Sequence, residues 1–468
     1  MHYVAFLVDH GKAPYRDIAE MNMPGAPMVD YLVIHILGPG SLAWRLFDLG
    51  LIGSAILAMV AIARPYDWVA GLFAGVLLGV IHGSDGVFDA GQRDFVVAVL
   101  VLIGYAALFR SQRAGEPRWM FIFGLCAGTA STIKPTFILL GPALLIALFT
   151  VRRRSRHPSL KFMAYGLAGF LLPLLGMIAM LAGFRALHAF VATTRGIMLY
   201  HASLARRPLG FLLTHSISPL VPLICIWLLT LPFLRSRWKS WEAAALAIGL
   251  LFGLLSYVVQ AKGYPYQRYP LIALLLLVIN VDLLDAIRGN SKVMRALGYA
   301  GLVFGVLYLA PKSVWAASRY DWRDTEFLDL LEHDLNQLGG PALSGRVQCI
   351  DTTGGCYNAL YREHLVQSTG FLYDEFIFGQ DRNGVVMANR RAFWTAIQAQ
   401  PPAVFIVVDG LFPSGPPGFG KLARWPQFDE YLRANYVMYA QRQPLHEVHW
   451  WSRPDPPQAY RLYVTKHD

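Results

Sequence analysis

The sequence has few charged residues for its length. Asp, Glu, Lys and Arg make up 15% of the 468 residues, whereas an average soluble protein has about 25%. Hydrophobic residues make up 55%, and the mean hydropathy is +0.41. Apolar runs long enough to cross a bilayer recur along the chain. The composition therefore excludes an ordinary soluble protein and indicates a polytopic membrane protein.

Several motifs of known chemistry are absent. The sequence has no Walker-type phosphate loop, no glycine-rich dinucleotide motif, no HExxH and no Asp-x-Asp pair. Nucleotide hydrolysis, dinucleotide redox chemistry, zinc proteolysis and nucleotide-sugar binding therefore lose their usual support. HEVH at residues 446–449 lacks the helical histidine spacing and a third ligand. We predict no metal site and no cofactor, and the need for a divalent metal stays open.

Apolar stretches predict an all-α bundle of about ten membrane segments. They cover about residues 42–62, 67–82, 94–109, 119–133, 136–150, 160–183, 210–234, 241–259, 269–287 and 294–311. The two segments on either side of Lys134-Pro135 are short for spanning helices. Glycines at four-residue spacing predict faces where helices approach closely. These are Gly71, Gly75 and Gly79, and Gly124 and Gly128.

The distribution of basic residues predicts the topology, because cytoplasmic loops are enriched in Arg and Lys. The basic loops are 110–118, 152–161, 235–239 and 288–295. The opposite, extracytoplasmic side receives residues 1–40, 83–93, 184–209, 260–268 and everything after Pro311. The net charge of +11 thus follows from membrane topology. It does not require a nucleic acid partner.

We predict three parts. Residues 1–40 form an extracytoplasmic loop with a short interfacial helix between Gly25 and Gly38, and residues 41–311 form the transmembrane bundle. The opening residues MHYVAFLV are too short for a helix or a signal peptide. Residues 312–468 are more polar and form a small extracytoplasmic α/β domain.

Periodicity within the C-terminal domain predicts its elements. Residues 324–338 have apolar side chains at helical spacing. Short strands are predicted at 346–350, 403–409 and 460–466. Cys349 and Cys356 are the only cysteines in this domain. Because disulfides persist outside the cytoplasm, we predict that these two cysteines pair.

Charged residues between apolar segments are candidates for function, because charge near hydrocarbon is costly. In the first outer loop, Asp17 and Glu20 are two carboxylates beside Arg16, and a carboxylate can act as a general base. A solvated loop is the alternative. The remaining candidates are Asp94, Arg93, Lys134, Lys262, Arg268 and Tyr264.

Cations beside interfacial tyrosines suit a lipid phosphate. Helix capping, tyrosine anchoring and lysine snorkelling are the structural alternatives for these outer residues.

The order of several strings resembles the GT-C superfamily of integral membrane glycosyltransferases, in the branch of protein O-mannosyltransferases and lipid A aminoarabinose transferases. The strings are GKAPYRDIAEMNMPG, RLFDL, GQRD, GLCAGTASTIKPT and KGYPYQRYP, followed by the C-terminal domain. The resemblance implies an enzyme of a bacterial inner membrane that moves a hexosyl or pentosyl group from a polyprenyl-phosphate-linked sugar to a lipid, glycan or protein. Membrane lipids are the other expected partners.

The resemblance also implies roles for the candidates. Arg16, Arg93, Lys134, Lys262, Arg268 and Tyr264 would hold the donor phosphate, and Asp17, Glu20 and Asp94 would act on the acceptor or orient the sugar. The sequence departs from the family at its start, where relatives have a further helix followed by an acidic base. That helix and that base are expected to be missing. A binder or flippase of lipid-linked glycans without transfer activity is therefore the alternative.

Overall fold

A computed structural model describes the chain in nine stretches. They are residues 2–86, 89–152, 160–233, 240–319, 326–352, 354–380, 383–413, 415–443 and 458–466. The chain forms two compact units. Unit 1 comprises Met1–Asn22, Met180–Ala205 and Asp321–Asp468, and unit 2 comprises Met23–Ala179 and Arg206–Tyr320. HEVH and most of the basic loops 152–161 and 235–239 lie outside the described residues.

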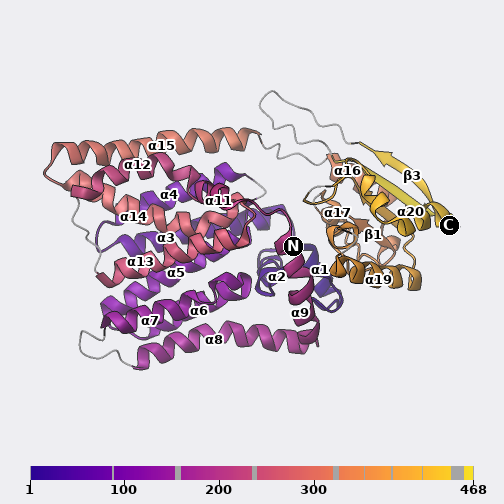
Figure 1. Cartoon of the computed structure of the whole chain (residues 1–468), viewed down its shortest axis with the longest axis horizontal. Coiled ribbons are helices and arrows are strands. Elements are labelled where there is room, and N and C mark those ends of the chain that lie inside the picture. Colours follow the sequence, from indigo (N-terminus) through magenta and orange to yellow (C-terminus); the bar gives the residue numbers. More distant parts are fainter. Residues whose placement is uncertain are drawn as a thin grey trace. The chain divides into compact units, whose positions relative to one another are not determined.

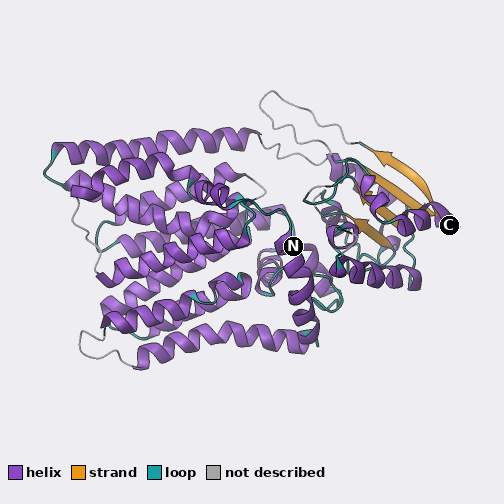
Figure 2. Cartoon of the chain, viewed as in Figure 1, coloured by secondary structure: helices purple, strands orange, loops and turns teal. Residues whose placement is uncertain are grey.

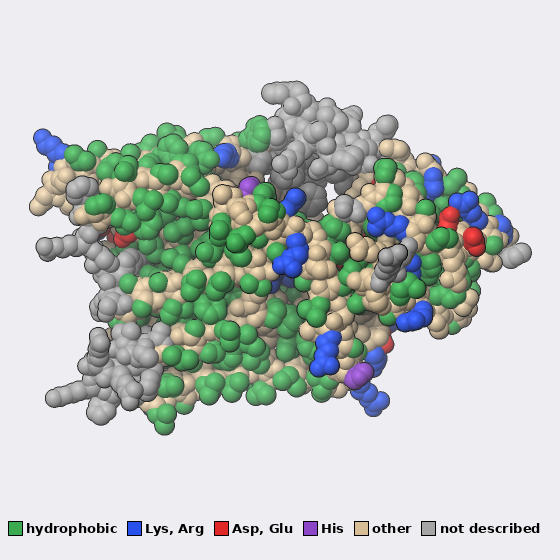
Figure 3. Space-filling model, viewed as in Figure 1, with side chains coloured by type: hydrophobic (Ala, Val, Ile, Leu, Met, Phe, Trp, Pro, Cys, Tyr) green, Lys and Arg blue, Asp and Glu red, His purple; other side chains and the backbone are tan. Residues whose placement is uncertain are grey.

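Unit 2 consists of helices (Figures 1 and 2). They are α2 (Gly25–Leu37), α3 (Ser41–Ala63), α4 (Trp68–Asp85), α5 (Arg93–Ala114), α6 (Arg118–Ile133), α7 (Leu140–Arg152), α8 (Leu160–Gly183), α11 (Leu209–Ser216), α12 (Val221–Thr230), α13 (Ser240–Gln260), α14 (Tyr269–Arg288) and α15 (Lys292–Arg319). Figure 3 shows hydrophobic side chains over much of the visible helical surface. This surface is typical of helices that face lipid, which confirms the predicted helical membrane bundle.

The number of spanning helices is smaller than the predicted ten. Among the described residues, seven helices are long and apolar enough to cross a membrane. The number becomes eight if α11 and α12, which are bent by 43° at Ile217, form one span. The difference lies at α6 and α7, which have 16 and 13 residues. Each is therefore shorter than the roughly 20 residues that cross the hydrocarbon core.

The spans differ in how deeply they are buried. In α5 and in the segment Pro265–Arg288, 78% of the spanning window is buried inside the protein, whereas in α3 and α8 the shares are 28% and 22%. The first two are thus central helices, and α3 and α8 lie at the periphery of unit 2. The predicted small faces are confirmed, since a side chain on Gly75 would collide with the backbone of α3 and one on Gly128 with the backbone of α8.

Unit 1 contains the mixed sheet and its helices. The helices are α1 (His2–Asp9), α9 (Leu187–Thr193), α10 (Leu199–Ser203), α16 (Glu326–Gln337), α17 (Cys356–Arg362), α18 (Glu375–Phe378), α19 (Gly384–Ala399) and α20 (Pro426–Asn435). The strands are β1 (Val347–Ile350), β2 (Val404–Val408), β3 (Tyr436–Arg442) and β4 (Tyr460–Thr465), in the order β1-β2-β4-β3. Among the described strands, β1 and β2 pair in parallel and the other neighbours pair antiparallel. This arrangement confirms the predicted small α/β fold.

Strand β3 and helix α1 correct the sequence predictions. Strand β3 lies at the edge of the sheet. Its consecutive residues Val437, Met438 and Tyr439 are all exposed. The strand therefore lacks the alternation of apolar and polar residues that predicts a strand. Helix α1 forms where no helix was expected, because five consecutive residues from Tyr3 to Leu7 are buried in the core of unit 1. Tertiary burial therefore stabilises a helix that is too short to be stable alone.

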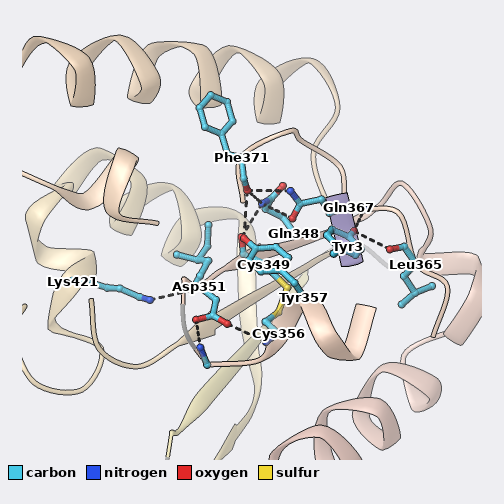
Figure 4. Close-up of a disulfide and its surroundings, with 12 residues drawn as sticks. Tyr3, Gln348, Cys349, Asp351, Cys356, Tyr357, Leu365, Gln367, Phe371 and Lys421 are labelled. Carbon is cyan, nitrogen blue, oxygen red and sulfur yellow. Dashed lines mark hydrogen bonds between the residues drawn. A yellow bond between two sulfur atoms is a disulfide. The ribbon is translucent and has the colours of Figure 1, made fainter. Parts of the chain in front are cut away.

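Tyr3 links α1 to the loop after α17 (Figure 4). Its hydroxyl donates to the carbonyl of Leu365 at 2.9 Å and accepts from the amide of Gln367 at 2.8 Å. Both bonds are buried, so the opening residues are part of the fold of unit 1.

Cys349 and Cys356 form a disulfide in this structure (Figure 4), with their Cα atoms 6.2 Å apart. The bridge closes the turn between β1 and α17. In that turn the carboxylate of Asp351 accepts hydrogen bonds from the amides of Gly354 and Cys356 at 2.7 and 3.0 Å. Both the covalent and the hydrogen bonds therefore hold the same turn.

We expect the denatured chain to bind two maleimide-polyethylene-glycol tags without reductant and four after reduction, because two of the four cysteines are paired. Closing so short a loop is expected to stabilise the fold by about 2–3 kcal/mol. The gel shift measures the pairing. Four tags without reductant would contradict it, and the Cys349→Ala variant should bind three under both conditions.

Candidate functional site

One predicted carboxylate, Asp94, and four predicted cations, Arg93, Lys134, Lys262 and Arg268, lie at or next to the ends of helices in unit 2. Asp85 is the last residue of α4, and Asp94 is in the first turn of α5. Arg268 ends the 3₁₀ turn Pro265–Arg268 that leads into α14. An acidic side chain is favourable in a first helical turn, where the amide dipoles point their positive ends outward.

Arg268 forms a buried ion pair with Asp85. One guanidinium nitrogen donates to Asp85 Oδ1 at 2.8 Å, and another donates to Ser218 Oγ at 3.1 Å. Tyr269 donates its hydroxyl proton to Asp85 Oδ2 at 3.0 Å. The side chains of Arg268 and Asp85 are 12% and 8% exposed. The pair thus joins α4 to the start of α14.

The network continues through two residues that the sequence did not single out. His82 Nδ1 lies 3.0 Å from the Tyr269 hydroxyl, and His82 Nε2 lies 3.0 Å from Asp48 Oδ1. Asp48 also accepts from the amide of Gly91 at 2.7 Å, and the His82 ring stacks on Phe95. Asp48 and His82 therefore connect Gly91, which precedes α5, with α3 and α4.

Lys134 and Asp94 form the second buried pair. Lys134 Nζ lies 3.0 Å from Asp94 Oδ2 and donates to Gln260 Oε1 at 2.6 Å. The Asp94 side chain is fully buried, and that of Lys134 is 12% exposed. Pro135 favours extended backbone at Lys134, which ends α6 there. The pair therefore connects the start of α5 with the ends of α6 and α13.

The other predicted residues of unit 2 lie on the same helix ends. Arg93 is half-buried and has no ion pair within the described parts of the chain. Lys262 is 8% exposed in the turn after α13, where Ala261 and Gly263 have positive φ angles. The ring of Tyr264 stacks on Tyr266 at 5.5 Å.

Asp89 is the acidic residue of this loop whose importance the sequence did not reveal. It is 6% exposed. Burial, with the nearby carboxylates of Asp85 and Asp94, raises the pKa of Asp89 to about 8, although Arg268 opposes the shift. A carboxyl with a pKa close to neutral is a candidate for proton transfer. The side chains of all three acids in GSDGVFDAGQRD are buried, so nothing in the sequence distinguishes Asp89 from Asp85 and Asp94.

We expect the stability difference between the wild type and Asp89→Asn to depend on pH. The unfolded pKa is about 3.9 and the folded value is about 8. Burial penalises the charged carboxylate and favours the neutral carboxyl. The wild type is therefore most stable relative to Asp89→Asn at acid pH, and it loses this stability as the pH rises from about 4 to 8. Denaturation of both proteins in detergent across this range measures the difference. A constant difference would contradict the assignment.

Arg16, Asp17 and Glu20 lie in unit 1. Arg16 Nη2 is 2.7 Å from Asp17 Oδ2, and this hydrogen-bonded pairing holds the pKa of Asp17 below its usual value. Glu20 is fully buried and accepts from the backbone and side-chain amides of Asn22 at 2.7 and 2.5 Å. Asp17 is therefore a weak base in this arrangement, and Glu20 supports the fold of its loop.

The predicted set thus divides between the two units. The structure joins Lys134 with Asp94 and Arg16 with Asp17, and it gives Arg268 a partner, Asp85, outside the predicted set. Within the nine described stretches, no group of three His, Cys, Asp or Glu side chains could hold a metal ion. The side chains described in unit 2 can therefore bind an anion through their cations and transfer protons through their carboxyl groups.

The helical bundle and the small α/β unit define a membrane protein with the GT-C architecture. Residues 23–177 match the family model of the dolichyl-phosphate-mannose-protein mannosyltransferases. This match and the fold confirm the resemblance to the GT-C superfamily of membrane glycosyltransferases. No curated protein sequence matches the chain.

Two solved structures of ArnT from Cupriavidus metallidurans have a similar fold at 13% sequence identity. The apo structure gives a TM-score of 0.58, with 98% of this chain and 91% of that one covered. The structure bound to undecaprenyl phosphate gives 0.53, with 94% and 88% covered. The likeness extends over nearly the whole chain, so both units take part in it.

Proposed function

We propose that the protein is a glycosyltransferase that moves a sugar from a polyprenyl-phosphate donor to a lipid, glycan or protein acceptor. The observation that carries this proposal is the pair of buried ion pairs, Lys134–Asp94 and Arg268–Asp85, at the helix ends of unit 2. Such charges are costly to bury and are rarely retained in a membrane protein without a function.

The cations suit the leaving group of the reaction. When the sugar leaves, negative charge develops on the lipid phosphate, and a fixed cation in a water-poor site stabilises that charge strongly. Lys134 and Arg268 are held by carboxylates, so a phosphate would have to compete with Asp94 and Asp85 for them. Arg93, Lys262 and Tyr264 are proposed to complete the phosphate site.

Carboxylates are proposed to act on the acceptor. Deprotonation of its hydroxyl or amine makes it a better nucleophile toward the anomeric carbon. Asp17, Glu20 and Asp94 keep the proposed role of acting on the acceptor or orienting the sugar, and Arg16 stays a proposed residue for the donor phosphate. The pKa of Asp89, about 8, adds it as a further proton acceptor or donor in the same loop as Asp94.

The proposed site lies on the extracytoplasmic face of a bacterial inner membrane. The alternation of basic loops supports this orientation, with the C-terminal α/β domain on the outer side. A polyprenyl-phosphate donor is supported by the similarity in fold to ArnT, which was solved with undecaprenyl phosphate. We also keep the proposed division of the chain into an outer loop (residues 1–40), a transmembrane bundle (residues 41–311) and a C-terminal domain (residues 312–468).

Turnover tests the proposal against a binder or flippase of lipid-linked glycans. A transferase releases free polyprenyl phosphate in proportion to the product formed, whereas a binder only retains the donor. Incubation of the purified full chain with a polyprenyl-phosphate-linked sugar and a membrane lipid extract, followed by mass spectrometry, measures the release. Donor binding without release would support the binder and contradict the transferase.

A further inference from the structure

A continuous helix in unit 1 has one face packed and one face uncovered. Helices α9 and α10 are joined by a π-helical turn, Thr194–Met198, so that the helix extends from Leu187 to Ser203. On its inner face Phe190 packs edge-on against Tyr15, with ring centroids 5.0 Å apart. Ile197 and Tyr200 are buried with Phe376. The inner face is therefore part of the core of unit 1.

The outer face is apolar and basic. Leu187, Val191 and Leu199 are 40%, 45% and 64% exposed, and Arg195 is exposed between them. These four residues follow one another at four-residue spacing. In a regular α-helix each such step overshoots a full turn by about 40°. The wider π turn offsets this drift, so that the stripe stays on one side of the helix.

The surrounding segment contains no acidic residue. Residues 184–210 include four arginines and two histidines, with no Asp or Glu. An apolar stripe with arginine and without carboxylates is typical of a helix that lies in the headgroup region of a membrane. Each basic side chain near an anionic leaflet contributes to the attraction. The charge thus selects an anionic surface over a neutral one.

Short connections link both ends of this helix to candidate membrane spans. Residues 184–186 connect it to α8, a candidate span, and residues 204–208 connect it to α11, where the bent span begins. A residue reaches at most about 3.5 Å along the chain. The first connection is therefore at most about 11 Å long and the second about 18 Å.

We propose that the outer face of Leu187–Ser203 binds an anionic phospholipid surface, with the three apolar side chains at the acyl boundary and Arg195 at the headgroup phosphates. This surface also carries the N-terminal loop and the α/β fold, because both pack on the inner face of the same helix. The inference is independent of the proposed transfer reaction.

A polarity-sensitive fluorophore on Val191→Cys tests the proposal in the full chain. Cys225 is exposed and would be changed to Ser, whereas Cys126 is buried. We expect blue-shifted emission and quenching by spin-labelled lipid in nanodiscs of phosphatidylcholine with phosphatidylglycerol, and weaker effects with phosphatidylcholine alone. Water-like emission in both would overturn the proposal. Equal quenching in both would overturn the role of the anionic lipid.

Charge reversal of one arginine provides the matched control. We expect Arg195→Glu to remove at least half of the quenching gained with phosphatidylglycerol. Arg433→Glu makes the same change of charge on α20 of unit 1, where the Arg433 side chain is 77% exposed, and should leave the quenching unchanged. Equal effects of the two variants would show that only net charge matters, which would contradict binding at this face.

Discussion

Replacing Lys134 with Met is expected to lower glycosyl transfer at least a hundredfold and stability by about 3–5 kcal/mol. The large effect on stability follows because the Asp94 side chain is fully buried and would lose its cation at 3.0 Å. The effect on transfer follows if the same cation stabilises the leaving phosphate. Initial rates at equal amounts of folded protein and denaturation in detergent measure the two effects separately.

The double variant Lys134→Met, Asp94→Leu separates stability from transfer. Removing both charges leaves no uncompensated carboxylate, so we expect stability to recover most of the loss. Transfer should stay low, because the cation is still missing. If the double variant regained normal transfer, the pair would have a structural role only, and Lys134 would be excluded from the phosphate site.

Arg268→Gln is expected to raise the KM for the lipid-linked donor about ten- to a hundredfold, since a charged hydrogen bond contributes about 1.5–3 kcal/mol. Asp85 would keep its bond from the Tyr269 hydroxyl at 3.0 Å, so the protein should remain folded. Steady-state kinetics with varied donor measure the change. Arg268→Lys should recover only part of the affinity, because it cannot reach Asp85 and Ser218 together.

Arg288→Gln is the matched control for Arg268. Arg288 ends the same helix, α14, at its other end, where it pairs with Asp67 and has a side chain that is 54% exposed. Asp67 is 6% exposed and would lose its cation, but it keeps the hydrogen bond from the amide of Val69 at 2.9 Å, so we expect some loss of stability and compare the variants at equal folded concentration. The donor KM should be unchanged. A similar rise of KM in both variants would indicate a general effect of charge on α14 and would contradict a phosphate site at Arg268.

The membrane helices could be predicted because the sequence shows apolar runs that are long enough to span a bilayer. Helices α3, α5 and α14 lie close to their predicted ranges, since a long apolar run has few other structures available to it in lipid. Helix α1 could not be predicted, because its stability comes from burial against distant residues such as Leu365. Strand β3 escaped prediction because consecutive apolar residues, Val437 to Tyr439, are exposed, so apolar and polar residues do not alternate along it.

The site was predictable only in part. Charged residues in the outer loops identified Asp94, Lys134 and Arg268, because charge beside apolar helices is visible in the sequence. Their partners were not visible, since Asp94 and Lys134 are 40 positions apart and Arg268 and Asp85 are 183 apart. Asp48 and His82 lie within apolar membrane helices, where sequence patterns do not distinguish them from residues of the core.

Release of polyprenyl phosphate by matched variants tests the central claim most directly. The wild type, Lys134→Met with Asp94→Leu, and Arg288→Gln would be compared at equal folded concentration with the same lipid-linked donor and acceptor extract. We predict release by the wild type and by Arg288→Gln, and at least a hundredfold less by the double variant. Donor binding without release by the wild type, or equal release by all three proteins, would contradict the account.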